Sequence, residues 1–189
     1  MLQEYSGQLV RLRPLEDDDL DAVMRLYRFT PNYWSAIGYG RDPVSKLHLQ
    51  SDFQEAQRTE GRQLYAVVRR ADNALIGVAD VQLEATMSDT ATIALLLIGG
   101  PYQQHGLGSE AADLLEQSLF SDPEIEFITA GVAETSQLGQ RFWLRRGYQF
   151  SGSTTHDPHT SRTTVWLAKK RPEAVPVAAQ NSQDQPTHQ

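Results

Sequence analysis

Residues 103–109, Gln-Gln-His-Gly-Leu-Gly-Ser, join two segments of different character. The preceding run, residues 90–98, is almost continuously apolar, which is typical of a central strand covered on both faces. The following residues, 107–119, place leucine and alanine at helical spacing. Glycines between a strand and a helix permit a tight turn, and they also let a phosphate approach the N–H groups of the helix N-terminus. The junction therefore predicts a strand-turn-helix unit whose turn is either purely structural or an anion site.

The rest of the chain predicts a mixed sheet with helices on its faces. Alternating apolar and polar residues indicate strands, and apolar residues three or four apart indicate helices. Asp42-Pro43 is a good N-cap and first-turn pair for the second helix. The aromatic-rich connection 28–41 is either a loop packed by its own rings or one wall of a binding cleft. The predicted strands are 9–15, 63–70, 74–85, 90–98, 124–134, 148–155 and 162–170, and the predicted helices are 16–27, 44–61, 107–119 and 136–147.

Length and composition bound the class of protein. A chain of 189 residues is long enough for one domain with a full core, and we expect that domain to span residues 1–170. Residues 171–189 are polar and aperiodic, which is typical of a disordered tail. The formal charge of −7 argues against nucleic acid as a partner, and no apolar run reaches membrane-spanning length. Because a signal-peptide pattern and cysteine are also absent, the sequence predicts a cytoplasmic protein without disulfides.

Two nucleotide-binding motifs can be compared with the glycine segment. Residues 106–111, Gly-Leu-Gly-Ser-Glu-Ala, formally match the GxGxxA form of the dinucleotide fingerprint. In a dinucleotide fold, however, the first glycine follows the first strand almost directly, whereas residues 99–105 intervene here. A phosphate loop of the Walker type requires Gly-Lys-Ser or Gly-Lys-Thr, which this chain lacks. A nicotinamide-dependent oxidoreductase is therefore a distant alternative.

Two separated motifs resemble those of the GCN5-related N-acetyltransferase (GNAT) superfamily. The acetyl-CoA motif of that family is Gln or Arg, two residues, Gly, one residue, then Gly or Ala, and residues 103–108 fit it. The resemblance runs from about Leu9 to Lys169, and it implies an α/β (α+β) fold. That fold is a GNAT-like mixed, mostly antiparallel sheet of about six to seven strands, with helices on both faces. The residues that occupy the positions of the second family signature are Ser136, Gly139, Trp143, Gly147 and Tyr148.

The resemblance also implies an activity, that of an acetyl-CoA-dependent N-acetyltransferase. The acetyl group would move from acetyl-CoA, the co-substrate, to a primary amine by direct attack in a ternary complex. In the family the end of the central strand splays from its neighbour, and Ile98 N–H would by position bind the oxyanion. The glycine segment would hold the pyrophosphate. The residues expected to contact acetyl-CoA are Leu97, Ile98, Gly99, Gln103, Gln104, His105, Gly106, Leu107, Gly108, Ser109, Ser136 and Trp143.

A general base and a general acid would complete this chemistry. Deprotonating a lysine-like amine costs about 4.6 kcal/mol at pH 7, against about 1 kcal/mol for an α-amine. Asp80, Gln82 and Glu84 share one strand face by the period of two, and of the two carboxylates Glu84 is a candidate catalytic base. Glu134, at the end of the strand after the CoA helix, is the other candidate. Trp143 stands where many family members carry a tyrosine acid, and an indole is no usable acid. A catalytically weak acyl-CoA-binding or regulatory protein is therefore the alternative function.

The sequence indicates only the chemical class of the molecule that would accept the acetyl group. We expect a small-molecule or peptide amine, and the acidic balance slightly favours a cationic one. No nucleic acid or membrane partner is expected. A homodimer is possible because it is common in the family, although no residue of this sequence indicates it. His105 suits proton transfer at neutral pH but lies inside the phosphate loop, so it is expected to contact cofactor or solvent. His156 and His159 lack a third well-spaced ligand and indicate a polar loop without a metal.

Overall fold

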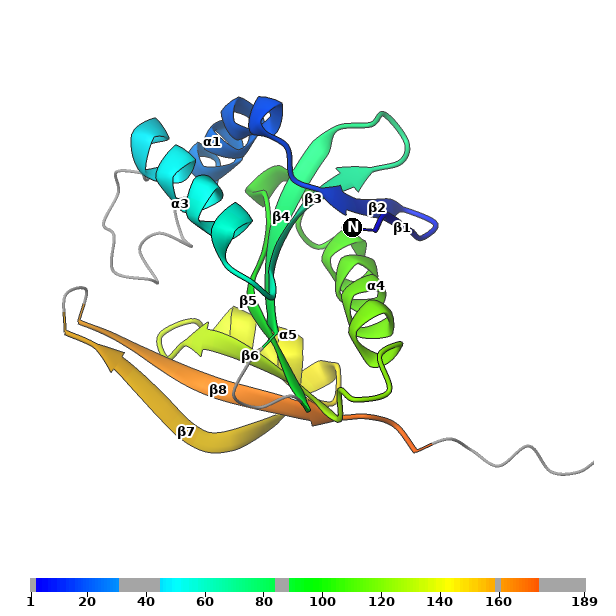
Figure 1. Cartoon of the computed structure of the whole chain (residues 1–189), viewed down its shortest axis with the longest axis vertical. Helices are drawn as coiled ribbons and strands as arrows, with labels where there is room; N and C mark the ends of the chain where they lie inside the picture. The colour runs from blue at the N-terminus through cyan, green and yellow to red at the C-terminus, as the bar shows by residue number, and fades with distance from the viewer. Residues whose placement is uncertain (1–2, 31–44, 84–88, 159–160, 174–189) are drawn as a thin grey trace, which may run out of the picture.

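The computed structural model describes residues 3–30, 45–83, 89–158 and 161–173 (Figure 1). Within these ranges eight strands form one sheet in the order β1-β2-β3-β4-β5-β6-β8-β7. The helices are α1 Leu20–Arg28, α3 Lys46–Arg58, α4 Leu107–Phe120 and α5 Gln137–Arg145, with short 3-10 turns at Asp17–Asp19 and Gly100–Tyr102. The strands are β1 Tyr5–Ser6, β2 Val10–Pro14, β3 Arg62–Arg69, β4 Leu75–Leu83, β5 Thr90–Ile98, β6 Phe127–Ala133, β7 Gln149–Asp157 and β8 Arg162–Lys170.

The sheet is mixed and mostly antiparallel, as the family resemblance implied. The one parallel pair among the described strands is β5–β6, and every other neighbouring pair is antiparallel. The strand number is one higher than the upper end of the expectation. The extra strand, β1, has two residues, so it is too short to produce a pattern in the sequence.

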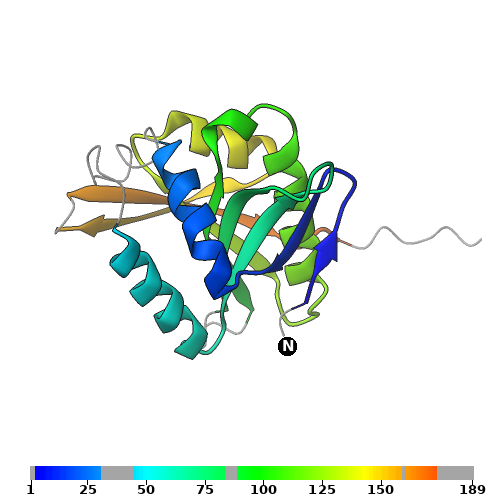
Figure 2. The same ribbon diagram turned by 90° about the horizontal axis from the view of Figure 1, so that it is seen from above.

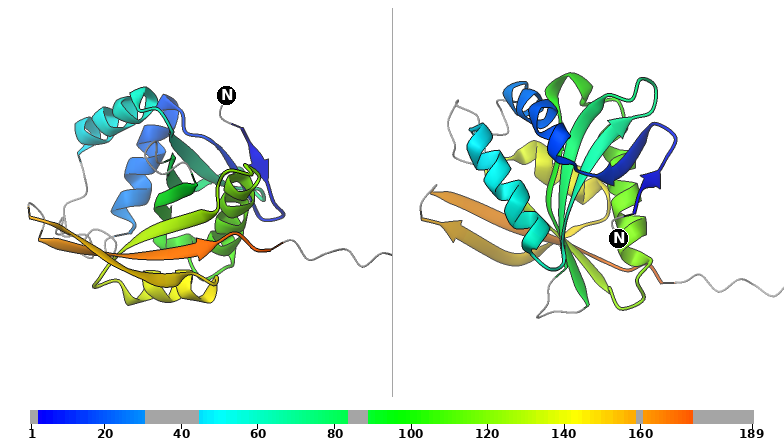
Figure 3. Two further views of the ribbon diagram at one scale, coloured as in Figure 1. Left: turned by 60° about the horizontal axis from the view of Figure 1, so that its bottom comes forward. Right: turned by 45° about the horizontal axis from the view of Figure 1, so that its top comes forward.

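The helices cover both faces of the sheet and define two apolar clusters. One cluster joins α4 and α5 to the sheet, and Leu115, Trp143 and Ile93 belong to it. The other joins α1 and α3 to the opposite face, through residues that include Val23 and Phe53. Figure 2 and the left view of Figure 3 show α3 and α5 on opposite sides of the strands β6 and β8. Because successive side chains of a strand point to opposite faces, β5 contributes to both clusters.

The N-terminal corner is fastened to α4 by one carboxylate. Glu110, in the first turn of α4, accepts hydrogen bonds from the backbone N–H groups of Gln8, Leu9 and Val10 at 2.7, 2.6 and 2.7 Å. A Cβ on Gly7 would lie 2.6 Å from the Glu110 carboxyl carbon, so the close approach requires glycine there. The helix that carries the glycine turn is thus tied to the start of the chain.

Several segments predicted from the sequence lie partly or wholly outside the described residues. The second helix, α3, begins at Lys46, and its N-cap is Ser45, whose Oγ accepts a hydrogen bond from His48 N–H at 3.2 Å. Asp42-Pro43 and most of the aromatic-rich connection 28–41 lie outside the described residues, as does most of the expected tail. No described helix is long and apolar enough to cross a bilayer.

Candidate functional site

The central feature of the site is a fork between β5 and β6. The two strands pair only from Thr90 with Phe127 to Ile93 with Ala130. Beyond these pairs β5 runs on to Ile98 and β6 to Ala133, and Figure 1 shows the two strands diverging. One edge of β5 is therefore left without a neighbouring strand over its last five residues.

Backbone groups of Ile98 face this open edge. The N–H of Gly99 donates to Ile76 O at 2.9 Å, toward β4. Because hydrogen-bonding direction alternates along an antiparallel strand, the N–H and C=O of Ile98 point away from β4, and those of Leu97 point toward it. Gln103 Nε2 donates to Ile98 O at 2.7 Å, which satisfies that carbonyl and leaves the Ile98 N–H facing the fork.

This geometry describes the backbone of the other two residues expected beside the cofactor at the end of β5. Gly99 offers no free backbone group, because its N–H is bound to Ile76 and its C=O accepts a hydrogen bond from Tyr102 N–H at 2.8 Å. Leu97 turns its backbone into the β4 ladder and its side chain into the core with α1 and α3. Of these three neighbours, Ile98 is the one whose N–H points away from β4, toward the open edge.

A cavity of about 120 Å³ occupies the fork. Its walls come from both faces of the sheet: Leu96, Val132 and Trp143 pack with α4 and α5, whereas Leu95 and Ala133 pack with α1 and α3. The gap between the strands therefore connects the two faces. The lining residues are Ile93, Ala94, Leu95, Leu96, Gly131, Val132, Ala133, Ser136, Gly139, Trp143 and Arg162.

The glycine turn lies directly after β5 and starts α4. Gly106 has φ 78°, a left-handed conformation that favours glycine, and its C=O accepts the first helical hydrogen bond, from Glu110 N–H at 3.0 Å. The N–H groups of Leu107, Gly108 and Ser109 precede that bond, so they have no acceptor within the helix. A Cβ on Gly108 would lie 3.2 Å from Ile98 Cγ1. The turn is thus structurally required and also presents an N-terminal set of donors.

The first three residues of the expected phosphate loop are all exposed. Gln103 is held by its hydrogen bond to the Ile98 carbonyl, and Gln104 has φ 65°. His105 is exposed as well, in agreement with a surface position for its imidazole. Gly106 and Ser109, at the start of α4, are also exposed.

The second motif forms the opposite wall of the fork. Ser136 is the N-cap of α5, and its Oγ accepts a hydrogen bond from Gly139 N–H at 3.3 Å. A Cβ on Gly139 would lie 2.9 Å from Val132 Cγ1, so glycine lets the helix pack closely on β6. Ser136 and Gly139 both line the cavity.

Trp143 is a wall of the cavity rather than an acid. Its side chain is 6% exposed and packs edge-on against the rings of Phe142 and Tyr148, with centroids 5.0 and 4.8 Å away. Burial raises the pKa of the Tyr148 hydroxyl far above its usual value, so this neighbour is no replacement acid. The motif supplies shape and an apolar surface.

The acids considered as catalytic bases differ in their burial and in their distance from the fork. Glu84 lies outside the described residues. Glu134 follows Ala133 at the end of β6 and is exposed; its N–H donates to Thr163 O at 2.8 Å. Asp80 is buried under α3, where burial raises its pKa and Arg62 Nη2 binds it at 2.7 Å. Asp80 is therefore a structural acid, and Glu134 is the described candidate near the fork.

Arg162 is a lining residue that the sequence analysis missed. It opens β8, and no motif marks it, because its position depends on the pairing of β8 with the far end of β6. Only the tertiary structure brings it to the fork.

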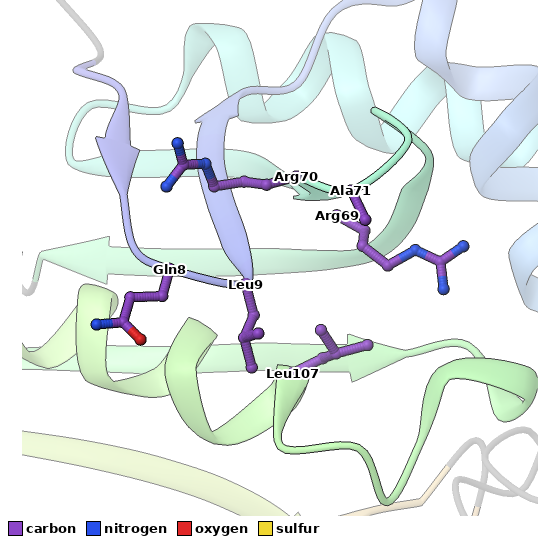
Figure 4. Close-up of a pocket in the computed structure, with 6 residues that line it drawn as sticks. All are labelled: Gln8, Leu9, Arg69, Arg70, Ala71 and Leu107. Carbon is purple, nitrogen blue, oxygen red and sulfur yellow. The ribbon is translucent and has the colours of Figure 1, made fainter.

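A larger and more open hollow, about 410 Å³, lies on the other side of the first turn of α4 (Figure 4). Its two arginines are already engaged. Arg69 pairs with Asp72 at 2.6 Å and lies over the Tyr102 ring, and Arg70 Nη1 donates to Gly7 O at 2.6 Å. This hollow is therefore a poorer candidate than the fork.

The structure also bears on the histidines. His156 lies on β7, with its Nδ1 3.4 Å from Thr163 Oγ1, and His159 is outside the described residues. Across the ranges that the structure describes, no group of three metal-ligating side chains comes together.

Comparison with known proteins agrees with this architecture. The model of the acetyltransferase (GNAT) domain matches residues 10–149. No curated protein matches the sequence at a significant level. An acetyltransferase from Thermus thermophilus is 21% identical, with a TM-score of 0.70 over 87% of this chain and 98% of the other.

Two further solved structures share the fold at low identity. An acetyltransferase from Salmonella typhimurium, described as modifying the N-terminal serine of ribosomal protein L7/L12, is 14% identical (TM-score 0.73, covering 90% of this chain and 100% of the other). The aminoglycoside acetyltransferase AAC(6')-Ib, solved with coenzyme A, is 19% identical (TM-score 0.69, covering 86% and 95%). At such identities the likeness establishes the fold and not the acceptor.

Proposed function

Because this chain belongs to the acetyltransferase (GNAT) family, whose members use acetyl-CoA, we propose that it acetylates a primary amine by direct attack in a ternary complex. The observation that carries the proposal is the open edge of β5 beside the N-terminus of α4. One ligand can reach both features at once, since only the turn 99–106 separates them. A thioester near the first and a pyrophosphate at the second match the two ends of the reactive arm of acetyl-CoA.

The residues around the fork fit such a cofactor. Leu107, Gly108 and Ser109 would hold the pyrophosphate through their N–H groups, with the favourable field of the helix N-terminus. Ile98 N–H would donate to the thioester oxygen, where negative charge develops during attack. When bound, acetyl-CoA supplies an activated acyl group. The protein supplies position, a donor for the developing charge and, through Trp143, an apolar wall that excludes water.

The amine would approach from the face that carries α1 and α3. The cavity opens to that face at Leu95 and Ala133, while the α4 N-terminus lies on the other. Glu134, directly after Ala133, is our base among the described residues, acting directly or through water, and Glu84 is the second candidate. A base matters most for a lysine-like acceptor, whose deprotonation at pH 7 costs about 4.6 kcal/mol. None of the described residues that line the cavity is a tyrosine, and another group or water would protonate the departing thiolate.

The first experiment is a calorimetric titration with acetyl-CoA, with NADH as the parallel control. Micromolar binding of acetyl-CoA alone supports the assignment, and binding of NADH instead would favour a dinucleotide site. Turnover is then followed by release of free CoA with a thiol reagent. The chain contains no cysteine, so the protein gives no background.

Kinetics test the mechanism and the base. Direct attack predicts intersecting initial-rate lines and no acetylated protein by mass spectrometry in the absence of amine. Parallel lines with a stable acetyl-protein would contradict it. Replacing the base, by Glu134→Gln or Glu84→Gln, should lower kcat/KM at the pH values where the wild-type carboxylate is ionised and should remove the acidic limb of the pH–rate profile. Unchanged profiles in both variants would exclude the two as bases.

The buried, packed position of Trp143 keeps one alternative open, a protein that binds acyl-CoA without efficient transfer. Micromolar binding together with negligible CoA release across a broad amine panel would favour it. Turnover at an ordinary enzymatic rate with any amine would exclude it.

A further inference from the structure

We propose that Arg162 binds a carboxylate of the acceptor, so that the preferred acceptors are amines that carry a carboxylate near the reacting nitrogen. The inference rests on the proposed function and names the substrate class of the same site. Arg162 lines the fork cavity, and its Nε is buried without a hydrogen-bond acceptor.

The sheet register places Arg162 on the acceptor side of the fork. Thr164 of β8 pairs with Ala133 of β6, so their side chains share a face. Arg162 lies two residues before Thr164 and therefore on that face as well. Ala133 packs with α1 and α3, the face from which the amine would approach. Arg162 is thus opposite to the side that carries the N-terminus of α4.

The guanidinium of Arg162 forms no ion pair in the part of the chain that the structure describes. Other partly buried arginines have carboxylate partners there: Arg13 binds Asp19, Arg62 binds Asp80, and Arg146 binds Glu116. Leaving a buried donor such as the Arg162 Nε unsatisfied carries a free-energy cost, which a bound oxyanion would remove.

The charge of the cavity points to a carboxylate rather than a phosphate. Among the described lining residues, Arg162 is the one that carries a charge. A single guanidinium matches a carboxylate in charge and offers the planar pair of donors that suits it. A phosphate carries close to two charges, and these lining residues include no second cation to neutralise them. The whole chain has a formal charge of −7, but the charge of Arg162 inside the cavity, not the net charge, determines which group of a ligand binds there.

A purely structural role for Arg162 makes a different prediction. Its aliphatic stem could cover the apolar wall of the cavity while the charge meets solvent. In that case a neutral replacement would affect stability and all acceptors alike. A carboxylate-binding role affects only acceptors that carry the carboxylate.

The test uses matched acceptors and matched variants. The acceptors are the dipeptides Ser-Ala and Gly-Ala with a free C-terminal carboxylate, each beside its C-terminal amide. The variants are Arg162→Gln, Arg162→Lys and the control Arg58→Gln, which changes an exposed arginine of α3 that does not line the cavity. Initial rates of CoA release give KM and kcat, and ligand-observed NMR saturation transfer measures acceptor binding independently of turnover.

We expect the wild type to prefer the acids by about 10–100-fold in KM, which is typical of one desolvated charge-assisted pair. Arg162→Gln should abolish that preference with little change for the amides, Arg162→Lys should restore part of it, and Arg58→Gln should retain it. Equal use and equal binding of acid and amide by the wild type would overturn the inference, as would a preference that survives in Arg162→Gln. Binding of none of the dipeptides would also count against it.

The two readouts separate this inference from the proposed function. If the wild type binds the acids selectively through Arg162 but releases no CoA with them or with the broad amine panel, acetyl transfer is refuted and the carboxylate site stands. If it acetylates acid and amide equally, the transferase proposal stands and the role of Arg162 is refuted.

Discussion

A negative charge introduced at Ser109 should have opposite effects on stability and on acetyl-CoA binding. Ser109 is exposed in the first turn of α4, before the first helical hydrogen bond. In Ser109→Asp, a carboxylate near the helix N-terminus should stabilise the fold by about 0.3–1 kcal/mol, or roughly 1–3 °C in Tm. The same carboxylate would stand about 6 Å from a pyrophosphate bound to these N–H groups, since both lie within one helical turn.

The loss of affinity can be worked out from these positions. Two unit charges about 6 Å apart repel by about 1.4 kcal/mol at an effective dielectric constant of about 40, which suits an exposed site. The two charges of a pyrophosphate double this repulsion, and screening at about 0.1 M salt reduces it to about 1.5 kcal/mol. The Kd for acetyl-CoA should therefore rise about tenfold. At about 1 M salt the Debye length falls to about 3 Å, and the difference should shrink to about twofold.

The assay is calorimetric titration at both salt concentrations, paired with thermal unfolding of the ligand-free proteins. Ser109→Asn is the matched neutral control, and it should bind like the wild type at either salt concentration. If Ser109→Asp binds acetyl-CoA as tightly as Ser109→Asn in low salt, the pyrophosphate does not lie at this helix end. A weakening that does not respond to salt would show that the substitution acts through shape and not charge.

Three further predictions concern residues that position the site. Glu110→Ala removes three hydrogen bonds to backbone N–H groups, two of them solvent-exposed, and should lower the unfolding free energy measured by urea titration by about 2 kcal/mol. An unchanged urea midpoint would mean that these hydrogen bonds do not contribute to stability. Ser136→Ala should lower the unfolding free energy by about 1 kcal/mol through loss of the α5 cap, and Ser136→Asn should restore it. If the Kd for acetyl-CoA is the same in both variants as in the wild type, a cofactor contact at this position is excluded. Burial would raise the pKa of Asp19, but its hydrogen bonds to Arg13 and to Glu16 N–H outweigh burial and hold that pKa below its usual range. The stability that Asp19 contributes should therefore be complete above about pH 4 and be lost as pH falls further. Asp19→Asn and wild type should differ in unfolding free energy at pH 7, and the difference should shrink as pH falls below about 4; a constant difference would contradict the ion pair.

The features that sequence could predict are local ones. The apolar run that became β5 and the glycines that start α4 are neighbours in the chain, so their spacing alone indicated a strand, a turn and a helix. The residues that complete the site are not local. Glu110 accepts a hydrogen bond from Gln8 across about a hundred residues, and Arg162 lines the same cavity as Leu95 only because β8 pairs with β6. Register between distant strands has no signature in a single sequence, because it follows from the packing of the whole sheet.

The short pairing between β5 and β6 also has a mechanical consequence. Four residue pairs join the β1–β5 part of the sheet to the β6–β8 part, and beyond them the described strands have no backbone pairing across the gap. A ligand that hydrogen-bonds to Ile98 on one side and packs on Val132 on the other acts as the missing cross-link between the two parts. Occupancy of the fork should then appear as rigidity: slower amide exchange at the tips of both strands and a Tm that rises with ligand concentration.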